Sequence, residues 1–378
     1  MLLEYGAKNY FCFKDGTSVS FELDANCPES ISGGRNFTPV LCVKGANGSG
    51  KTNLLKIPAF LGMFCARSFY FETDQPIPLS SHFESADPTE FYAEFISGGV
   101  KYAYELVATD TEILRETIYR TRAKRTKVVE RMGNEITTVT NALRKLTSIK
   151  LRWNVSIISM AHQYELSELA DCYQFFSNIA SNVGYSGLNH VTPDVSTVSK
   201  ALIGDQETLG FIKSFIQSCD AGISDIVIHS MKKGDKTDYF PAFIHDTTSG
   251  PGLITDITES SGTKVLFTTL GTYRKVLNTG GLLVLDEFDM NLHPHILPKL
   301  VNLFLDPEIN VKDAQLIFTT HNSEIMNTLG RYRTYLVNKE RNESYAYRLD
   351  EIPGDLLRND RPITPAYNEG KIGGVPRL

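Results

Sequence analysis

The chain of 378 residues is long enough for one large α/β domain with an insertion, or for about two domains. Hydrophobic residues make up 42% of it and charged residues 22%, as in ordinary globular proteins, which excludes wholesale disorder, collagen and coiled-coil rods. A net charge of −6 excludes a uniformly basic nucleic-acid coat, so any contact with a phosphate backbone needs a local basic patch.

The six cysteines form no Cys-x-x-Cys pair and no zinc-ribbon spacing, which is typical of reduced thiols in a cytoplasmic protein. The first residues include Glu4 where a secretory signal peptide is basic and then apolar. No apolar run approaches the roughly 18–20 residues that a membrane span needs. We therefore expect a cytoplasmic protein with no membrane segment.

The first third of the chain predicts strands around one glycine-rich loop. Residues 2–23 alternate in the manner of a hairpin, and an apolar strand over 40–43 leads into the loop. A helix follows the loop, and Pro58 is expected to kink it or to tighten its early turns. Strand-like alternation returns between 91 and 131.

The middle of the chain changes to a helical period. Apolar residues recur at helical spacing between 141 and 215, which predicts a helical insertion that is looser around 184–193. Two strand signals follow, at 223–228 and 239–244. The last third is α/β, with helices predicted at 264–277, 295–305 and 323–329 and strands at 282–285, 315–319 and 334–338.

Residues 45–52, GANGSGKT, fit the phosphate-loop pattern G-x-x-x-x-G-K-[ST] and lie after a strand and before a helix, as this loop requires. The glycines let backbone N–H groups face the phosphates, and the helix N-terminus adds roughly half a positive charge. Lys51 supplies a cation for the phosphates and Thr52 a hydroxyl for Mg²⁺. The predicted ATP-binding residues here are Asn47, Gly48, Ser49, Gly50, Lys51, Thr52 and Asn53.

A second motif consists of the apolar run 282–285 followed by two acidic residues, Asp286 and Glu287. The run suits a central parallel strand that is buried on both faces. Asp286 is expected to hold Mg²⁺ through water, and Glu287 to polarise the water that attacks the γ-phosphate. Alone, the pattern is also that of an ordinary strand end; the phosphate loop favours the catalytic interpretation.

Histidines give one catalytic candidate. His321 ends a second apolar strand, where an imidazole can reach a γ-phosphate; a satisfied core histidine is the alternative. His293 and His295 lack a third ligand at a sensible spacing, which indicates a turn rather than a metal site.

In this order the motifs resemble those of an ABC-type ATPase head of the SMC/RecF/OLD branch, above all the small ATPases of bacterial abortive-infection systems, RloA-like or AbiL-like. The resemblance runs from the opening KNYFCFKDGTSVSF to the ending YNEGKIGGVP, so it covers essentially the whole chain. It identifies 45–52 as Walker A, 260–264 as the signature, 285–287 as Walker B, 291–294 as the D-loop and 319–321 as the switch-histidine segment.

The resemblance implies an α/β fold, with a mixed-sheet lobe and a parallel-sheet lobe forming the ATPase head and a mainly helical insertion between them. The implied parts are 1–120 with Walker A, 121–225 with a basic hairpin and the insertion, and 226–378 with the remaining motifs. It also implies that Glu287 and His321 act in catalysis, and that Ser260, Ser261 and Gly262 contact ATP.

The sequence departs from this family at three points. The signature is Ser-Ser-Gly-Thr instead of Leu-Ser-Gly-Gly, and Phe11 stands where the family often has a basic residue. Gln75 is the one candidate for the Q-loop glutamine, and a surface-loop residue is the alternative interpretation. No Asp-x-Asp pair occurs, so the nuclease that follows the ATPase in OLD proteins is not expected.

A basic stretch, 120–152, contains ten Lys and Arg residues and only two acidic ones. It could serve as a surface for nucleic acid or for an acidic partner protein. A solvated hairpin edge that charge protects from aggregation explains it equally well.

The motifs together predict an ATPase that binds ATP and Mg²⁺ and hydrolyses ATP slowly. It is expected to form a homodimer or higher oligomer through ATP-sandwiched heads and to act as sensor of an anti-phage system that controls a separately encoded effector or toxin. The alternatives are a DNA-repair or chromosome-maintenance ATPase acting directly on DNA, and a scaffold whose nucleotide is structural.

Overall fold

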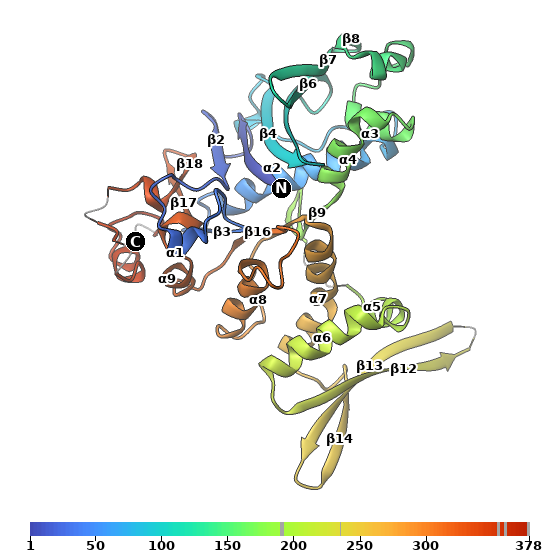
Figure 1. The fold of residues 1–378 in the computed structure, drawn as a ribbon, viewed down its shortest axis with the longest axis vertical. Helices are drawn as coiled ribbons and strands as arrows, with labels where there is room; N and C mark the ends of the chain where they lie inside the picture. Colours follow the sequence, from blue (N-terminus) through green and yellow to red (C-terminus); the bar gives the residue numbers. More distant parts are fainter. Residues whose placement is uncertain (190–192, 235, 354–355, 359–360, 376–378) are drawn as a thin grey trace.

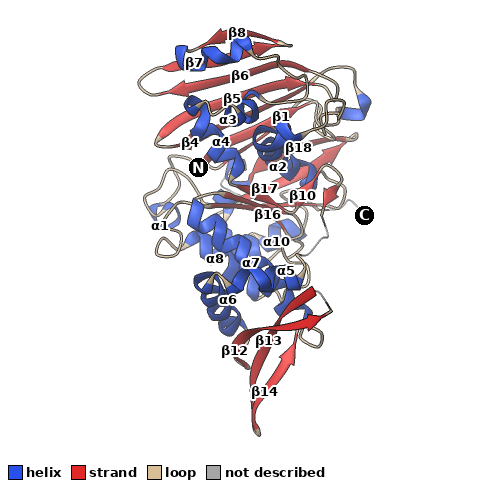
Figure 2. Cartoon of the chain, turned by 90° about the vertical axis from the view of Figure 1, so that its right-hand side faces the viewer, coloured by secondary structure: helices blue, strands red, loops and turns tan. Residues whose placement is uncertain are grey.

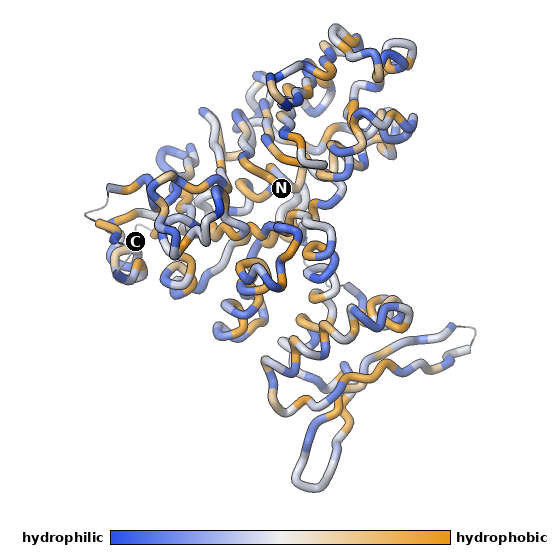
Figure 3. Tube along the Cα trace, viewed as in Figure 1, coloured by the Kyte–Doolittle hydropathy of each residue, from blue (hydrophilic) through white to orange (hydrophobic). Residues whose placement is uncertain are grey.

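The computed structural model describes residues 1–189, 193–234, 236–353, 356–358 and 361–375. They form three regions along the longest axis of the molecule (Figure 1, Figure 2). An antiparallel sheet lies at one end, a mixed sheet in the middle, and a small projecting sheet with its helices at the other end. Hydrophobic segments occur in all three regions, including the projecting sheet (Figure 3).

The antiparallel sheet has seven strands in the order β2-β1-β4-β5-β6-β7-β8. Alternate residues of its strands face the core, and in β4 these are Phe91, Ala93 and Phe95, as the sequence predicted. Its strands are β1 (Leu2–Lys8), β2 (Thr17–Ser20), β4 (Thr89–Ser97), β5 (Val100–Ala108), β6 (Ile113–Thr121), β7 (Arg125–Met132) and β8 (Glu135–Val139).

The central sheet has six strands in the order β18-β17-β3-β16-β15-β9. All neighbours are parallel except β17 and β18, which form an antiparallel pair at one edge. Its strands are β3 (Val40–Gly45), β9 (Ile179–Ser181), β15 (Leu282–Leu285), β16 (Gln315–Thr319), β17 (Thr334–Glu340) and β18 (Glu343–Arg348).

Alternate side chains of the central strands face two different cores. In β3, Leu41 and Val43 belong to the core that contains α2 (Lys51–Arg67) and the antiparallel sheet. Val40 and Cys42 belong to the core that contains α6, α7 and α8. Burial on both faces explains why β3, β15 and β16 have continuous apolar runs in the sequence.

The remaining helices lie on the two sides of this sheet. Helices α3 and α4 pack against α2. On the other side, α5 and α6 contact the three-stranded sheet β12-β13-β14, and α7 packs against α6. These elements are α3 (Ile157–Gln163), α4 (Ala170–Ser177), α5 (Val195–Ile203), α6 (Gln206–Cys219), β12 (Ile223–Lys233), β13 (Lys236–Thr247), β14 (Gly250–Thr255), α7 (Ser261–Thr279) and α8 (Ile296–Leu305). Short elements are α1 (Glu29–Ser32), α9 (Ile325–Leu329), α10 (Thr364–Asn368) and the hairpin of β10 (Val183–Gly184) and β11 (Gly187–Leu188).

The predicted α/β class is confirmed, and the buried strands β15 and β16 have the predicted bounds. Pro58 lies inside α2, which continues through it to Arg67. Residues 125–139, where a basic hairpin is expected, form β7 and β8 of the antiparallel sheet. One segment differs from expectation. The segment expected to be helical between 141 and 215 includes β9, the edge strand of the central sheet.

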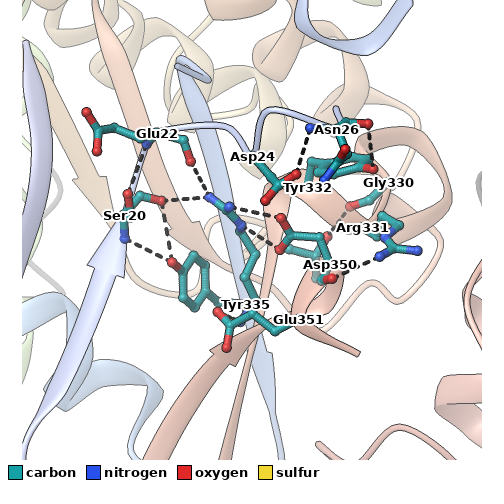
Figure 4. A network of polar contacts seen from close by, with 12 residues as sticks. Ser20, Glu22, Asp24, Asn26, Gly330, Arg331, Tyr332, Tyr335, Asp350 and Glu351 are labelled. Atoms are coloured by element: carbon teal, nitrogen blue, oxygen red, sulfur yellow. Dashed lines mark hydrogen bonds and ion pairs between the residues drawn. The ribbon is translucent and has the colours of Figure 1, made fainter. Parts of the chain in front are cut away.

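A polar network ties the N-terminal hairpin to the C-terminal strands (Figure 4). The Arg348 guanidinium at the end of β18 pairs with both carboxylate oxygens of Asp350, at 2.7 and 2.9 Å. It also donates to the carbonyl of Ser20, the last residue of β2, and to the carbonyl of Glu22.

In the described part of the chain, no helix combines the length and hydropathy needed to cross a membrane.

Candidate functional site

The predicted phosphate loop connects the end of β3 to the start of α2, and its Gly50 is required by space as well as by conformation. Gly50 has φ +112°, and a Cβ there would lie 2.6 Å from Cys12 Sγ. The Ser344 hydroxyl on β18 donates to the Ser49 carbonyl at 2.7 Å. The loop is therefore held from outside by the N-terminal segment and by β18.

Lys51 begins α2, and its ammonium points back along the loop. Nζ donates to the carbonyls of Gly45 and Ala46 at 3.0 and 3.1 Å. Burial lowers the pKa of Lys51, and the negative charges of Asp286 and Glu287 oppose that shift. These contacts orient the ammonium at the mouth of the loop, where the sequence predicted a cation for the phosphates.

The two predicted metal ligands are in direct contact. Thr52 Oγ1 on α2 donates to Asp286 Oδ2 at 2.6 Å, although the two residues are 234 positions apart in sequence. Asp286 follows β15 and is almost completely buried. A hydroxyl and a carboxylate at one point are the hard oxygen donors that Mg²⁺ takes while it keeps several waters. The residues present therefore fit a magnesium ion.

Thr319, at the end of β16, holds both acids of the Walker B motif. Its hydroxyl donates to Asp286 Oδ1 at 2.5 Å and accepts the backbone N–H of Glu287 at 2.8 Å. The exposed Glu287 has φ +49°, a left-handed conformation that is uncommon for a residue other than glycine. Such backbone strain persists when neighbouring contacts fix the residue, and Thr319 supplies one of them.

Asn182, directly after β9, holds Asp286 from the opposite side. Its Nδ2 donates to the Asp286 carbonyl at 2.9 Å, and its Oδ1 accepts the Asp286 N–H at 2.8 Å. Asn182 was not predicted as a site residue, because it lies in the segment expected to be helical. The Gln75 side chain lies in a local turn, where it accepts the N–H of Glu72.

His321 follows β16 and has an exposed side chain, so it is not a core histidine. Its backbone N–H faces both carboxylate oxygens of Asp289, at 3.3 and 3.2 Å. The preceding carbonyl, of Thr320, accepts a hydrogen bond from the buried ammonium of Lys44 at 2.8 Å. Since β3, β9, β15 and β16 are parallel, the phosphate loop, Asn182, Asp286 and His321 all lie at the same edge of the sheet.

The predicted signature residues form the start of α7. Ser260 caps the helix, because its hydroxyl accepts the Thr263 N–H at 3.1 Å. A Cβ at Gly262 would lie 3.2 Å from the Asn291 carbonyl, so the signature approaches the predicted D-loop. Within the described residues, Ser260, Ser261 and Gly262 make no hydrogen bond to the phosphate loop or to Asp286 of the same chain.

Glu259, which no sequence motif includes, links this signature to the projecting sheet. One of its carboxylate oxygens accepts the Ser260 N–H at 2.7 Å, and the other contacts Nε2 of His245 at 2.9 Å. Because His245 belongs to β13, the position of the signature depends on the projecting sheet.

Five of the ten cations in the basic stretch form ion pairs or hydrogen bonds within the chain. Arg120 pairs with Glu168, Arg125 with Glu105 and Lys127 with Glu130, while Arg152 donates to backbone carbonyls. Arg131 is completely buried beside Glu116 at 3.7 Å. The other five cations of the stretch are exposed and form no ion pair with a described residue: Arg122, Lys124, Arg144, Lys145 and Lys150.

A family model described as "AAA domain, putative AbiEii toxin, Type IV TA system" matches residues 40–327, which contain every motif from Walker A to His321. No curated protein matches the sequence. Solved structures similar to this chain include an SMC head bound to the C-winged helix domain of ScpA, at 13% identity and TM-score 0.49, covering 92% of this chain and 97% of that one. The SMC head domain from Thermotoga maritima is 15% identical with TM-score 0.45, covering 92% of this chain and 98% of that one.

Proposed function

Because this chain belongs to the AbiEii-like family of AAA domains, we propose that it binds ATP together with Mg²⁺ and hydrolyses ATP slowly. The observation that carries the proposal is the hydrogen bond between Thr52 and Asp286. It joins the Walker A and Walker B motifs from distant parts of the chain at one edge of a parallel sheet, where such sheets bind ligands.

In the proposed reaction the chain mainly positions groups and stabilises charge. The backbone N–H groups of the phosphate loop and the Lys51 ammonium bind the phosphate oxygens. Glu287 orients the attacking water and takes its proton, while His321 contacts the γ-phosphate. Thr52 and Asp286 would hold Mg²⁺, which neutralises the charge of the phosphates when it is bound.

Phosphate release from ATP by the purified protein tests this proposal. We expect Lys51→Ala to abolish tight ATP binding, and Glu287→Gln to bind ATP but to stop hydrolysis. Glu135→Gln is the matched control, because Glu135 is exposed at the start of β8 in the antiparallel sheet. Unchanged ATP affinity of Lys51→Ala in a calorimetric titration would refute the site.

For the biological role, we propose a cytoplasmic sensor or regulatory ATPase of an anti-phage, abortive-infection system that controls a separately encoded effector. The description of the family names AbiEii as a toxin of a toxin–antitoxin system, so a partner protein is expected. We expect the chain to be harmless when it is expressed alone, and to form a complex with the product of a neighbouring gene. Toxicity of this chain alone, lost in Glu287→Gln, would instead identify it as the toxic component.

A second candidate function is a DNA-repair or chromosome-maintenance ATPase that acts directly on DNA. The five exposed cations of the basic stretch favour it, because cations without partners are free to neutralise phosphates. Stimulation of ATP hydrolysis by duplex DNA would select this function, provided that the double variant Lys124→Glu, Lys145→Glu no longer responds to DNA. ATP hydrolysis that DNA does not change would eliminate it.

A further inference from the structure

A groove lies beside Glu287, on the side of the central sheet where β9 forms the edge. It encloses about 770 Å³, which is within the range of small-molecule sites. One wall is α2, the second is the segment from β9 to β11, and the third is α7 together with the D-loop.

Most of the groove is apolar. Phe60 and Met63 of α2 lie along one wall, Leu188 of β11 along the second, and Val265 and Tyr273 of α7 along the third. A ligand that fills the groove therefore needs an apolar body. Because α2 begins with Lys51 and α7 begins with the signature, the same ligand would touch both helices that carry nucleotide-binding motifs.

One charged side chain of this groove has no polar partner among the residues that the structure describes. Lys56 is only 8% exposed, and among the described residues its ammonium makes no hydrogen bond and no ion pair. Nζ lies 3.8 Å from the centre of the Phe11 ring, and Lys56 also lines the groove. Burial lowers the pKa of Lys56.

A largely buried ammonium without a partner is costly, and an anion that pairs with it offsets part of that cost. Among the described residues that line the groove, two are cations, Lys56 and Arg67, and one is an acid, Glu287, so the groove favours a negatively charged ligand. The Phe11 ring covers the ammonium on one side only, and no described residue provides an acceptor for the three N–H donors of Lys56.

We propose that the groove is a regulatory binding site for an organic anion, whose charged group pairs with Lys56 and whose apolar body lies between α2 and α7. The binding half of this proposal is independent of the proposed ATPase function, and the regulatory half rests on it. A site that contacts Glu287 and both motif-bearing helices can change hydrolysis when it is filled.

Anilinonaphthalene sulfonate is a suitable probe, because it joins an aromatic body to one sulfonate. Its fluorescence is titrated against the full chain without nucleotide. We expect Lys56→Met to weaken binding at least roughly fivefold, because a charge-assisted hydrogen bond is lost. Lys56→Arg, which keeps the charge, and Lys145→Met, an exposed lysine outside the groove, should bind within about twofold of the unchanged chain.

Equal binding of the probe by Lys56→Met and the unchanged chain would overturn the site. Thermal unfolding separates this result from misfolding, since Lys56→Met removes an unpaired buried charge and should not lower the melting temperature. Saturating probe should also change the ATP hydrolysis rate of the unchanged chain but not that of Lys56→Met. Binding through Lys56 without any effect on hydrolysis would overturn the regulatory half alone.

Discussion

At the scale of single residues, two short polar side chains decide the geometry of the Walker B motif. Thr319 holds the Asp286 carboxylate and the Glu287 backbone from β16, and Asn182 holds both backbone groups of Asp286 from β9. Asp286 and Glu287 could be predicted from sequence because an apolar run that ends in two acids is a recognisable pattern. Asn182 and Thr319 could not be assigned these roles, because each acts through a contact between strands that are distant in sequence.

Thr319→Val tests this positioning role, because it keeps the shape of the side chain and removes its hydroxyl. We expect the turnover number to fall about 10–100-fold, the usual cost of losing a hydrogen bond that orients a metal-binding carboxylate. The affinity for ATP should change little, since the phosphate loop is untouched. Steady-state kinetics and a calorimetric titration measure the two quantities.

Thr319→Ser is the matched control, because it restores the hydroxyl and should recover most of the turnover. A purely structural role for Thr319 predicts that both variants lower the melting temperature equally and that turnover follows stability. Turnover of Thr319→Val equal to that of the unchanged chain would contradict the role.

At the scale of elements, burial and length determine which strands could be predicted from sequence. The strands β15 and β16 are buried on both faces and give continuous apolar runs, so their bounds could be predicted. The three-residue β9 is too short to show any period, and it exists because it pairs with β15. The charges of the basic stretch suggested an exposed hairpin, yet the neutralised, buried Arg131 shows that charge alone does not establish exposure.

The link between β13 and α7 leads to an element-scale prediction. Glu259→Ala removes the acceptor of the Ser260 N–H and the partner of His245. If the signature contacts ATP on a second copy, the loosened start of α7 should weaken ATP-dependent self-association roughly tenfold. ATP binding by a single chain should stay unchanged, because the phosphate loop lies elsewhere.

Sedimentation velocity with ATP, in the Glu287→Gln background, measures that self-association. Glu340→Gln serves as control, since Glu340 is an exposed residue at the end of β17. Equal self-association of the Glu259→Ala and Glu340→Gln variants would refute a role for this link.

At the scale of the whole molecule, distant segments of the chain are joined by polar contacts as well as by the two large cores. The Arg348 network joins the N-terminal hairpin to the C-terminal strands (Figure 4). The Arg348 and Asp350 side chains are only 9% and 6% exposed. This contact could not be predicted from sequence, because its partners lie at opposite ends of the chain.

Arg348→Met should therefore lower the free energy of unfolding by about 3 kcal/mol or more, because it leaves the Asp350 carboxylate buried without its partner. Urea unfolding measures the change. Lys371→Met is the matched control: Lys371 and Glu369 form an ion pair whose side chains are 60% and 56% exposed, and such pairs contribute little. Equal effects of the two substitutions would show that the Arg348 pair is not a stabilising link.

The last prediction concerns assembly. Ser260 and Ser261 lie at the start of α7, where backbone N–H groups and the helix dipole favour an anion, but they make no hydrogen bond to the phosphate loop of their own chain in the described residues. A second copy related by a two-fold axis would bring its signature to this ATP and receive the same contact in return. ATP should therefore convert Glu287→Gln from a monomer into a dimer, since that variant binds ATP without consuming it. Ser261→Arg should prevent the dimer, because the larger side chain would block the phosphate. Light scattering reports the mass directly, and a Glu287→Gln protein that stays monomeric at saturating ATP would show that the two motifs do not meet across an interface.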